Sequence, residues 1–312
     1  MVWSCLVSIL PGMAQTEKLT DYVNPFVGTD GYGNVYPGAQ IPFGGIQISP
    51  DTDSRFYDAA SGYKYNHLTL MGFSLTHLSG TGIPDLGDFL FIPGTGEMKL
   101  EPGTHEDPDQ GYRSRYSHDK EWASPNYYAV ELADYGVKAE MTSGVRSGMF
   151  RFTYPESDNA FIMIDMNHTL WQSCEWSNLR MINDSTITGY KLVKGWGPER
   201  HVYFTATFSK KLTGLRFVQD KKPVIYNTSR FRSSYEAWGK NLMACISFDT
   251  KAGEEVTVKT AISAVSTDGA RNNMKELDGL TFNELRAKGE ALWEKELGKY
   301  TSVSYTHLRA HE

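Results

Sequence analysis

Short alternating runs of apolar and polar residues, separated by turns, dominate the chain from about residue 127 onward. In the clearest case, residues 128–132 and 137–141 alternate on either side of Ala133-Asp-Tyr-Gly136, a pattern that predicts a β-hairpin. The same alternation recurs at residues 149–154, 161–164, 201–208, 242–248 and 255–262. Many short strands with little helix between them predict a mainly β protein, an antiparallel β-sandwich, and argue against a parallel sheet with crossover helices.

The pattern takes on a helical period after residue 266. Thr281-Phe-Asn-Glu284 has the form of a capping box, which satisfies backbone N–H groups at a helix start. One stripe at helical spacing then contains Phe282, Leu285, Leu292 and Trp293. We expect a sandwich domain over residues 19–265 and a helical linker over 266–300. The helix has little further sequence to pack against, so we expect it to lead into a domain that this chain lacks.

Residues 24–82 contain glycine at positions 28, 31, 33, 38, 44 and 45 and proline at 25, 37 and 42. These residues exclude a helix and any long central strand, so the segment is predicted to be loop. The interspersed tyrosines offer flat apolar faces with a hydroxyl at the rim, which suits a sugar ligand: Tyr32, Tyr36, Tyr57, Tyr63 and Tyr65. From composition alone, a glycine-rich cap whose tyrosines form its own small core is the favoured alternative.

Bulk composition removes some classes of function. The 312 residues are 40% hydrophobic and carry a net charge of −6, which gives no basic field for a nucleic acid. No run approaches the ~18 apolar residues of a membrane span. Residues 1–14 resemble the end of a secretory signal whose basic start is missing, so we expect an exported protein, in the periplasm, at the cell surface or secreted. Residues 301–312 continue neither pattern and are expected to be a non-native tail.

Candidate acidic residues lie within and beside the glycine-rich segment. Asp51 and Asp53 lack the remaining ligands of a calcium-binding helix-loop-helix, and we expect them to cap a turn. Asp85 and Asp88 flank a glycine and could form a carboxylate pair in a cleft, but a solvated turn is favoured. No dinucleotide fingerprint, phosphate loop, zinc motif or nucleophile elbow occurs in the sequence.

Three further residue types leave their roles open. His77 lies just before Gly80-Thr-Gly82, where a sharply turning backbone could aim an imidazole into a cleft, although a structural histidine is the commoner case. Trp171, Trp176 and Trp196 could be sugar platforms or packing residues. Cys174 and Cys245 could pair or stay free.

A combination of motifs in the first third of the chain resembles the N-terminal domain of glycoside hydrolase family 92, the calcium-dependent exo-acting α-mannosidases. The motifs are Asp21-Tyr-Val-Asn-Pro-Phe-Val-Gly-Thr29, Tyr36-Pro-Gly-Ala39, Pro42-Phe-Gly44, Ser61-Gly-Tyr63 and Gly72-Phe-Ser-Leu-Thr-His-Leu-Ser-Gly-Thr-Gly82. The similarity extends from about Leu19 to Tyr300. It raises the sugar-facing interpretation of the loops above the purely structural one.

The resemblance implies a sandwich of the galactose-mutarotase-like type, a helical linker and a C-terminal (α/α)6 barrel that is missing here. The family inverts configuration with an acid and a base about 6.5–9.5 Å apart. The resemblance also implies that the acid, the base and the calcium ligands lie in the barrel, so no catalytic or metal-binding residue is expected in this chain. Eight residues are expected to line the pocket that binds a mannose-containing glycan: Gly28, Thr29, Tyr57, Tyr63, His77, Ser79, Gly80 and Thr81.

Two other functions compete with a pocket-completing domain. The tyrosine-rich loops could make the chain an autonomous carbohydrate-binding module, although half a pocket is expected to bind mannose poorly. The exposed amphipathic helix could instead pair with another chain, which would make this a structural or interaction domain.

Overall fold

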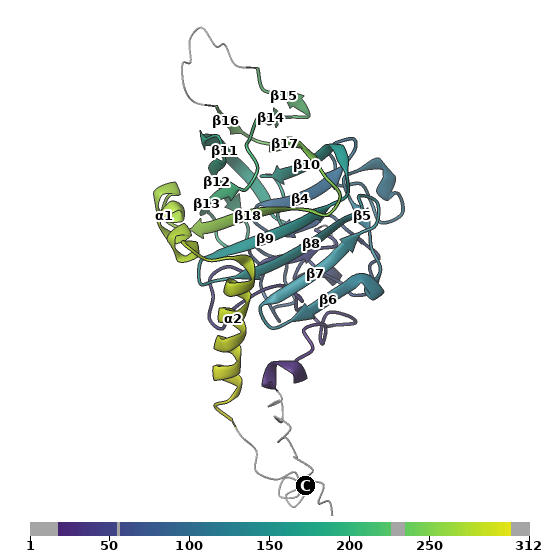
Figure 1. The fold of residues 1–312 in the computed structure, drawn as a ribbon, viewed down its shortest axis with the longest axis vertical. Helices are drawn as coiled ribbons and strands as arrows, with labels where there is room; N and C mark the ends of the chain where they lie inside the picture. Colours follow the sequence, from purple (N-terminus) through teal and green to yellow (C-terminus); the bar gives the residue numbers. More distant parts are fainter. Residues whose placement is uncertain (1–17, 55–56, 226–234, 301–312) are drawn as a thin grey trace, which may run out of the picture.

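The computed structural model describes residues 18–54, 57–225 and 235–300. The expected signal at residues 1–14 and the expected tail at residues 301–312 therefore lie outside the described residues. Within the described part, antiparallel strands form two large sheets and a small pair, followed by a short helical part (Figure 1). The predicted mainly β, antiparallel sandwich is confirmed.

The larger sheet has the order β16 (Glu236–Gly239), β11 (Ser173–Asn183), β12 (Thr186–Lys194), β13 (Arg200–Phe208), β18 (Glu254–Ser263), β9 (Ser147–Tyr154), β8 (Val137–Ser143), β7 (Tyr127–Leu132) and β6 (Glu121–Ser124). The smaller has the order β1 (Ser49–Asp51), β3 (Gly72–Ser74), β4 (Leu90–Thr95), β10 (Ser157–Asp165), β17 (Leu242–Thr250), β14 (Gly214–Gln219) and β15 (Lys222–Pro223). A separate pair joins β2 (Thr69–Leu70) to β5 (Ser114–Arg115). Single 3-10 turns occur at η1 (Leu19–Tyr22), η2 (Tyr57–Ala59), η3 (Pro108–Gln110), η4 (His118–Lys120) and η5 (Met274–Leu277).

The two large sheets share one apolar core. Phe91 of β4 packs against Phe150 of β9 with ring centroids 4.9 Å apart, and Phe89 packs against Phe204 of β13 at 4.4 Å. Alternation in the sequence places such side chains inward: in β18, Val256, Val258 and Thr260 are buried, while Thr257 and Lys259 between them are partly exposed. Burial of such side chains supplies the main driving force for folding.

The predicted hairpin is confirmed, whereas one long hairpin was not predicted. β7 pairs with β8 from Tyr128 opposite Met141 to Leu132 opposite Val137, around a turn that ends at Gly136 with a φ of +64°. The hairpin of β11 and β12 was missed because register shifts near both ends of β11 break its alternation, and many of its residues are polar. Cys174 of β11 and Cys245 of β17 are both free and buried.

The C-terminal part contains α1 (Thr267–Asn273) and α2 (Phe282–Leu297), which extends beyond the sheets next to η1 (Figure 1). The predicted capping box is confirmed: Glu284 N–H donates to Thr281 Oγ1 at 3.3 Å, and Thr281 N–H donates to the Glu284 carboxylate at 2.8 Å. The expectation that the helix has little to pack against is wrong for its first turn, because Phe282 and Leu285 are buried in a cluster with strand residues of β7 and β9.

Candidate functional site

Glycine-rich turns bring two segments of the predicted site together at the surface. Gly28 is exposed with a φ of +85°, and a Cβ on Gly33 would lie 2.0 Å from the Gly28 carbonyl oxygen, so this close approach requires glycine. Thr29 is buried, and its hydroxyl donates to the carbonyl of Phe26 at 2.8 Å. Thr29 therefore holds the turn, while Gly28 presents backbone to solvent.

The second segment, Ser79-Gly-Thr81, is exposed and is tied to the first through its backbone. The N–H of Gly80 donates to the carbonyl of Asn34 at 2.5 Å, and Gly80 has a φ of +77° with nothing near the position of a Cβ. The Thr81 hydroxyl donates to the carbonyl of Ile83 at 3.0 Å. Ser79, Gly80 and Thr81 thus lie together on the surface, as expected for residues that face a ligand.

The imidazole of His77 points inward, beneath these loops. Its Nδ1 lies 2.8 Å from the carbonyl oxygen of Gln47, and its Nε2 lies 2.7 Å from Asp51 Oδ1 and 3.1 Å from Ser74 Oγ. The other carboxylate oxygen of Asp51 lies 2.8 Å from Nε2 of His168. All three ionisable side chains are buried, so a polar triad of Asp51, His77 and His168 joins β1, the loop after β3 and the segment after β10.

Hydrogen bonds and charge fix the protonation of Asp51 in this triad. A carbonyl and a carboxylate oxygen can only accept, so each nitrogen of His77 faces an acceptor. Burial alone would raise the pKa of Asp51, but its contacts with His77 and His168 outweigh burial and hold the pKa well below its usual range. Asp51 is therefore a carboxylate, and the expectation that it caps a turn is wrong, because its two oxygens contact His77 and His168.

Asp88 forms a second buried ion cluster below the same loops. Its carboxylate accepts from Arg200 Nη1 at 2.6 Å and from the hydroxyl of Thr76 at 2.7 Å, and it lies 3.1 Å from Nζ of Lys191. Burial would raise the pKa of Asp88, but the two cations hold it below its usual range. The expectation of a solvated turn is wrong for Asp88, because its partners come from β12 and β13, more than 100 residues later. It holds for Asp85, which accepts from its own turn at Leu86 N–H.

The two predicted tyrosines have opposite environments. Tyr57 is 57% exposed and contacts the ring of Trp171 edge to face at 6.3 Å. Tyr63 is buried, and its hydroxyl lies 2.9 Å from the carboxylate of Glu121, the acceptor of the Tyr63 hydrogen bond. Tyr57 can therefore touch a ligand directly, whereas Tyr63 and His77 support the loops from inside.

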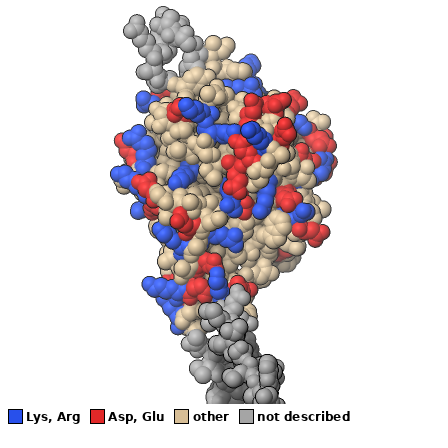
Figure 2. Space-filling view, in the orientation of Figure 1, with Lys and Arg blue, Asp and Glu red and all other residues tan. Residues whose placement is uncertain are grey.

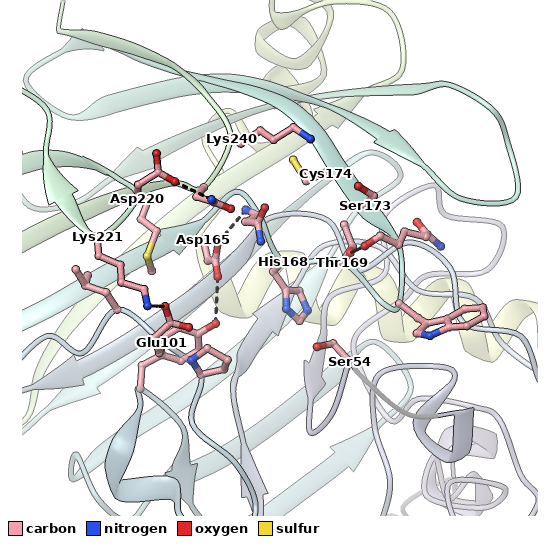
Figure 3. A pocket seen from close by; sticks show the side chains of 18 residues that line it. Ser54, Glu101, Asp165, His168, Thr169, Ser173, Cys174, Asp220, Lys221 and Lys240 are labelled. Carbon is pink, nitrogen blue, oxygen red and sulfur yellow. Dashed lines mark hydrogen bonds and ion pairs between the residues drawn. The ribbon is translucent and has the colours of Figure 1, made fainter.

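A polar cleft of about 710 Å³ lies beside Trp171, and sequence reasoning did not find it. Its lining includes Asp165, His168 and Gln172, which follow or end β10, together with residues of the β14–β15 turn and the start of β17 (Figure 3). No local signal marks His168, since its partner Asp51 lies 117 positions away in the sequence.

The fit of a metal ion was tested on the donor groups. Within residues 18–54, 57–225 and 235–300, no group of three or more His, Cys, Asp and Glu side chains could hold a metal ion. Both oxygens of Asp51 are already occupied by imidazoles. The described part of the chain therefore offers no cluster of these side chains that could hold the calcium ion implied by the resemblance.

Surface charge and helix length bear on other partners. Positive and negative side chains are mixed over the face in Figure 2, which shows no extended basic field. In the described part of the chain, none of the helices has the length and apolar character needed to cross a membrane.

Comparison with known proteins places these features in a family. The model of the glycosyl hydrolase family 92 N-terminal domain matches residues 22–263, so the chain belongs to this family of glycosidases through that domain. It is similar to the family GH92 alpha-mannosidase of Bacteroides thetaiotaomicron solved in complex with mannoimidazole, at 99% identity and a TM-score of 0.90, over 92% of this chain and 38% of that one.

Two further proteins are more distantly similar to this chain. An uncharacterized secreted glycosidase of Arthroderma benhamiae is 26% identical over 89% of this chain and 38% of that protein. The family GH92 inverting mannosidase of Bacteroides thetaiotaomicron VPI-5482 is 24% identical with a TM-score of 0.76, over 91% of this chain and 37% of that one. This chain thus spans a little over a third of the length of each relative.

Proposed function

We propose that this chain forms the N-terminal wall of the mannose pocket of an inverting exo-α-mannosidase acting on glycans and is catalytically inactive by itself. The observation that carries the proposal is the 99% identity to one part of a solved α-mannosidase. The exposed group of Gly28, Tyr57 and residues 79–81 supports it, because these residues offer backbone groups, two hydroxyls and an aromatic face to a sugar.

The carboxylates beneath the loops cannot supply the chemistry. An inverting glycosidase needs a protonated acid and a separate base about 6.5–9.5 Å apart, with water between the base and the sugar. Asp51 and Asp88 both have pKa values below their usual range, so neither carries a proton to donate at neutral pH. Asp51 is also enclosed by two imidazoles, and Asp88 by Lys191 and Arg200. We therefore assign the acid, the base and the calcium ion to a C-terminal barrel domain.

The same proposal gives the chain a partner surface for that barrel. Phe43 is 88% exposed, and its loop is held to β8 and β9 by a 2.6 Å hydrogen bond from Gly45 N–H to the carbonyl of Val145. The indole of Trp293 in α2 donates to the carbonyl of Gln40 in the same loop. Exposed apolar side chains at Phe43, Val145 and Leu292 therefore surround the point where the helix leaves the sandwich, and we propose that the barrel covers them.

We also propose that the protein is exported. The apolar residues 1–10 followed by small residues support this, and the name of the Arthroderma benhamiae relative describes a secreted protein. Fractionation of cells that express the chain, with detection of the cleaved N-terminus after Ala14, tests the proposal; recovery of uncleaved chain from the cytoplasm alone would contradict it.

The enzymatic proposal is tested by comparing this chain with a longer protein that has the full length of its α-mannosidase relative. Release of mannose from α-mannosides with calcium present is expected from the longer protein and not from the 312-residue chain. A longer protein without activity on any α-mannoside would end the proposal, and activity of the short chain would end its second half.

A variant of the longer protein tests the role of the loop. Thr81→Ala is expected to lower kcat/KM by about fivefold, mainly through KM, because one sugar-facing hydrogen bond of about 1 kcal/mol is lost. Thr213→Ala, at an exposed threonine beyond the loops, is the matched control. Equal kinetics for both variants would remove Thr81 from the pocket.

A further inference from the structure

The cleft beside Trp171 is lined by described residues of this chain and has the size of a ligand site. Its volume of about 710 Å³ lies inside the roughly 300–1,000 Å³ range of small-molecule sites. His168 lies in the middle of the lining, between Asp165 and Ser54 (Figure 3). The walls come from the segment after β10, from residues 100–102 and from the turn between β14 and β15.

Two polar side chains in the lining each have a hydrogen-bonding atom without a partner among the described residues. Nε2 of His168 is hydrogen-bonded to Asp51, so Nδ1 is the ring nitrogen left to contact a ligand. Within residues 18–54, 57–225 and 235–300, Nδ1 has no hydrogen-bond partner in the structure. The Oε1 atom of Gln172 is buried and also lacks a partner in the described part, while its amide donates to the carbonyl of Pro84. A buried acceptor without a partner is rare in folded proteins, so Gln172 marks this wall as polar, and the ring of His168 is the candidate contact for a ligand hydroxyl.

An aromatic rim completes the cleft. Trp171 has a φ of +66°, a strained backbone conformation for a bulky residue. Its side chain is nevertheless 61% exposed, so burial of the ring does not account for this conformation. Tyr57 packs against its edge and keeps the indole standing at the mouth of the cleft. A flat, partly exposed ring beside convergent polar groups suits the apolar face of a sugar.

Pairing of charges inside the cleft argues for a neutral ligand. Lys221 forms an ion pair with Glu101 at 2.6 Å, and Lys240 forms one with Glu175 at 3.1 Å. Asp220 accepts from the amide of Asn241 at 2.7 Å. Because the cations already have carboxylate partners, the cleft has no free positive group for a phosphate or an acidic sugar among the described residues.

We propose that this cleft binds a neutral oligosaccharide, with the indole of Trp171 stacked on a sugar ring and with the imidazole of His168 hydrogen-bonded to a sugar hydroxyl. The inference goes beyond the proposed mannosidase function and does not depend on it, because the cleft lies wholly within this chain and its binding can be measured without hydrolysis.

The test is calorimetric and NMR titration of the 312-residue chain with an α-linked mannotriose, with maltotriose and with inorganic phosphate. Saturable binding of either oligosaccharide, with shifts of the His168 ring and the Trp171 indole resonances, is expected. No saturation by either sugar up to about 10 mM, the range needed for a millimolar Kd, would overturn the proposal. Saturation by phosphate alone, or sugar binding without shifts at these two side chains, would also overturn it.

Trp171→Gly provides a matched variant, because the left-handed backbone at this position suits glycine and the exchange removes the ring alone. At least a tenfold loss of oligosaccharide affinity is expected, with circular dichroism used to verify the fold. Trp122→Ala, at an exposed tryptophan of β6 outside the cleft, is expected to bind as the parent does. Unchanged affinity in a folded Trp171→Gly chain would contradict the proposal, and a mannosidase assay of the longer protein has no bearing on that outcome.

Discussion

Replacing Asp51 is the sharpest test of the buried triad beneath the glycine-rich loops. Asp51 accepts from Nε2 of His77 at 2.7 Å and from Nε2 of His168 at 2.8 Å, and it is fully buried. Asp51→Asn keeps the shape but removes the charge. Hydrogen bonds to charged groups contribute about 1.5–3 kcal/mol and neutral ones about 0.5–1.5, so the loss over two bonds is about 2–3 kcal/mol.

Asp51→Ala is expected to cost more, because it leaves both imidazoles buried without an acceptor. Breaking a buried ion pair by removing one partner costs about 3–5 kcal/mol. Urea unfolding followed by circular dichroism gives the free energy of unfolding for each variant. Asp268→Asn is the control, since Asp268 is largely exposed and pairs only with a surface arginine, a contact of about 0–1 kcal/mol.

The pH dependence of unfolding tests the same charge. The pKa of Asp51 is lowered in the folded state, so its contribution is fully present above the unfolded carboxyl pKa of about 3.9 and is lost as pH falls further toward the lowered value. The difference in stability between the parent and Asp51→Asn should therefore be constant above about pH 5 and shrink below pH 4. An Asn variant as stable as the parent at pH 7, or a difference that grows in acid, would refute the assignment of Asp51 as a carboxylate.

Three further predictions concern local structure. A Cβ on Gly62 would lie 2.1 Å from Asp51 Oδ1, and Gly62 has a φ of +86°, so Gly62→Ala should lower the free energy of unfolding by about 3 kcal/mol or more. Gly80→Ala is the comparison, with an expected loss of about 1 kcal/mol, because no atom lies near the position of its Cβ. Urea unfolding midpoints of the two variants test the difference. Burial raises the pKa of Cys245 to about 11 and also raises the pKa of Cys174, so neither thiol should be reactive in the folded chain. In a Cys5→Ser variant, a thiol reagent should therefore label no cysteine of the native chain and both cysteines after unfolding. Thr281→Ala should lower stability by about 1 kcal/mol through the lost cap of α2, and an unchanged unfolding midpoint would contradict this.

Elements with local signals were predictable from the sequence. The hairpin of β7 and β8 follows from alternation around a single turn, and the start of α2 follows from four consecutive residues, Thr281 to Glu284. The β11–β12 hairpin was not predicted because its register shifts interrupt the alternation of apolar and polar residues. Local order is therefore visible in the sequence where one period persists, and it is hidden where a bulge interrupts the period.

The polar residues of the loops show a different limit. The sequence predicts that Asp51 caps a turn and that Asp88 lies in a solvated turn, because aspartate is common in turns and nothing within a few residues contradicts this. The residues that bury them, His168 and Arg200, lie 117 and 112 positions away from their respective partners. Only the strand order, which brings the segment after β10 and the start of β13 under the loops, creates these pairs. The loops are thus held from below by polar and charged contacts between distant segments, which gives glycine-rich loops a fixed shape.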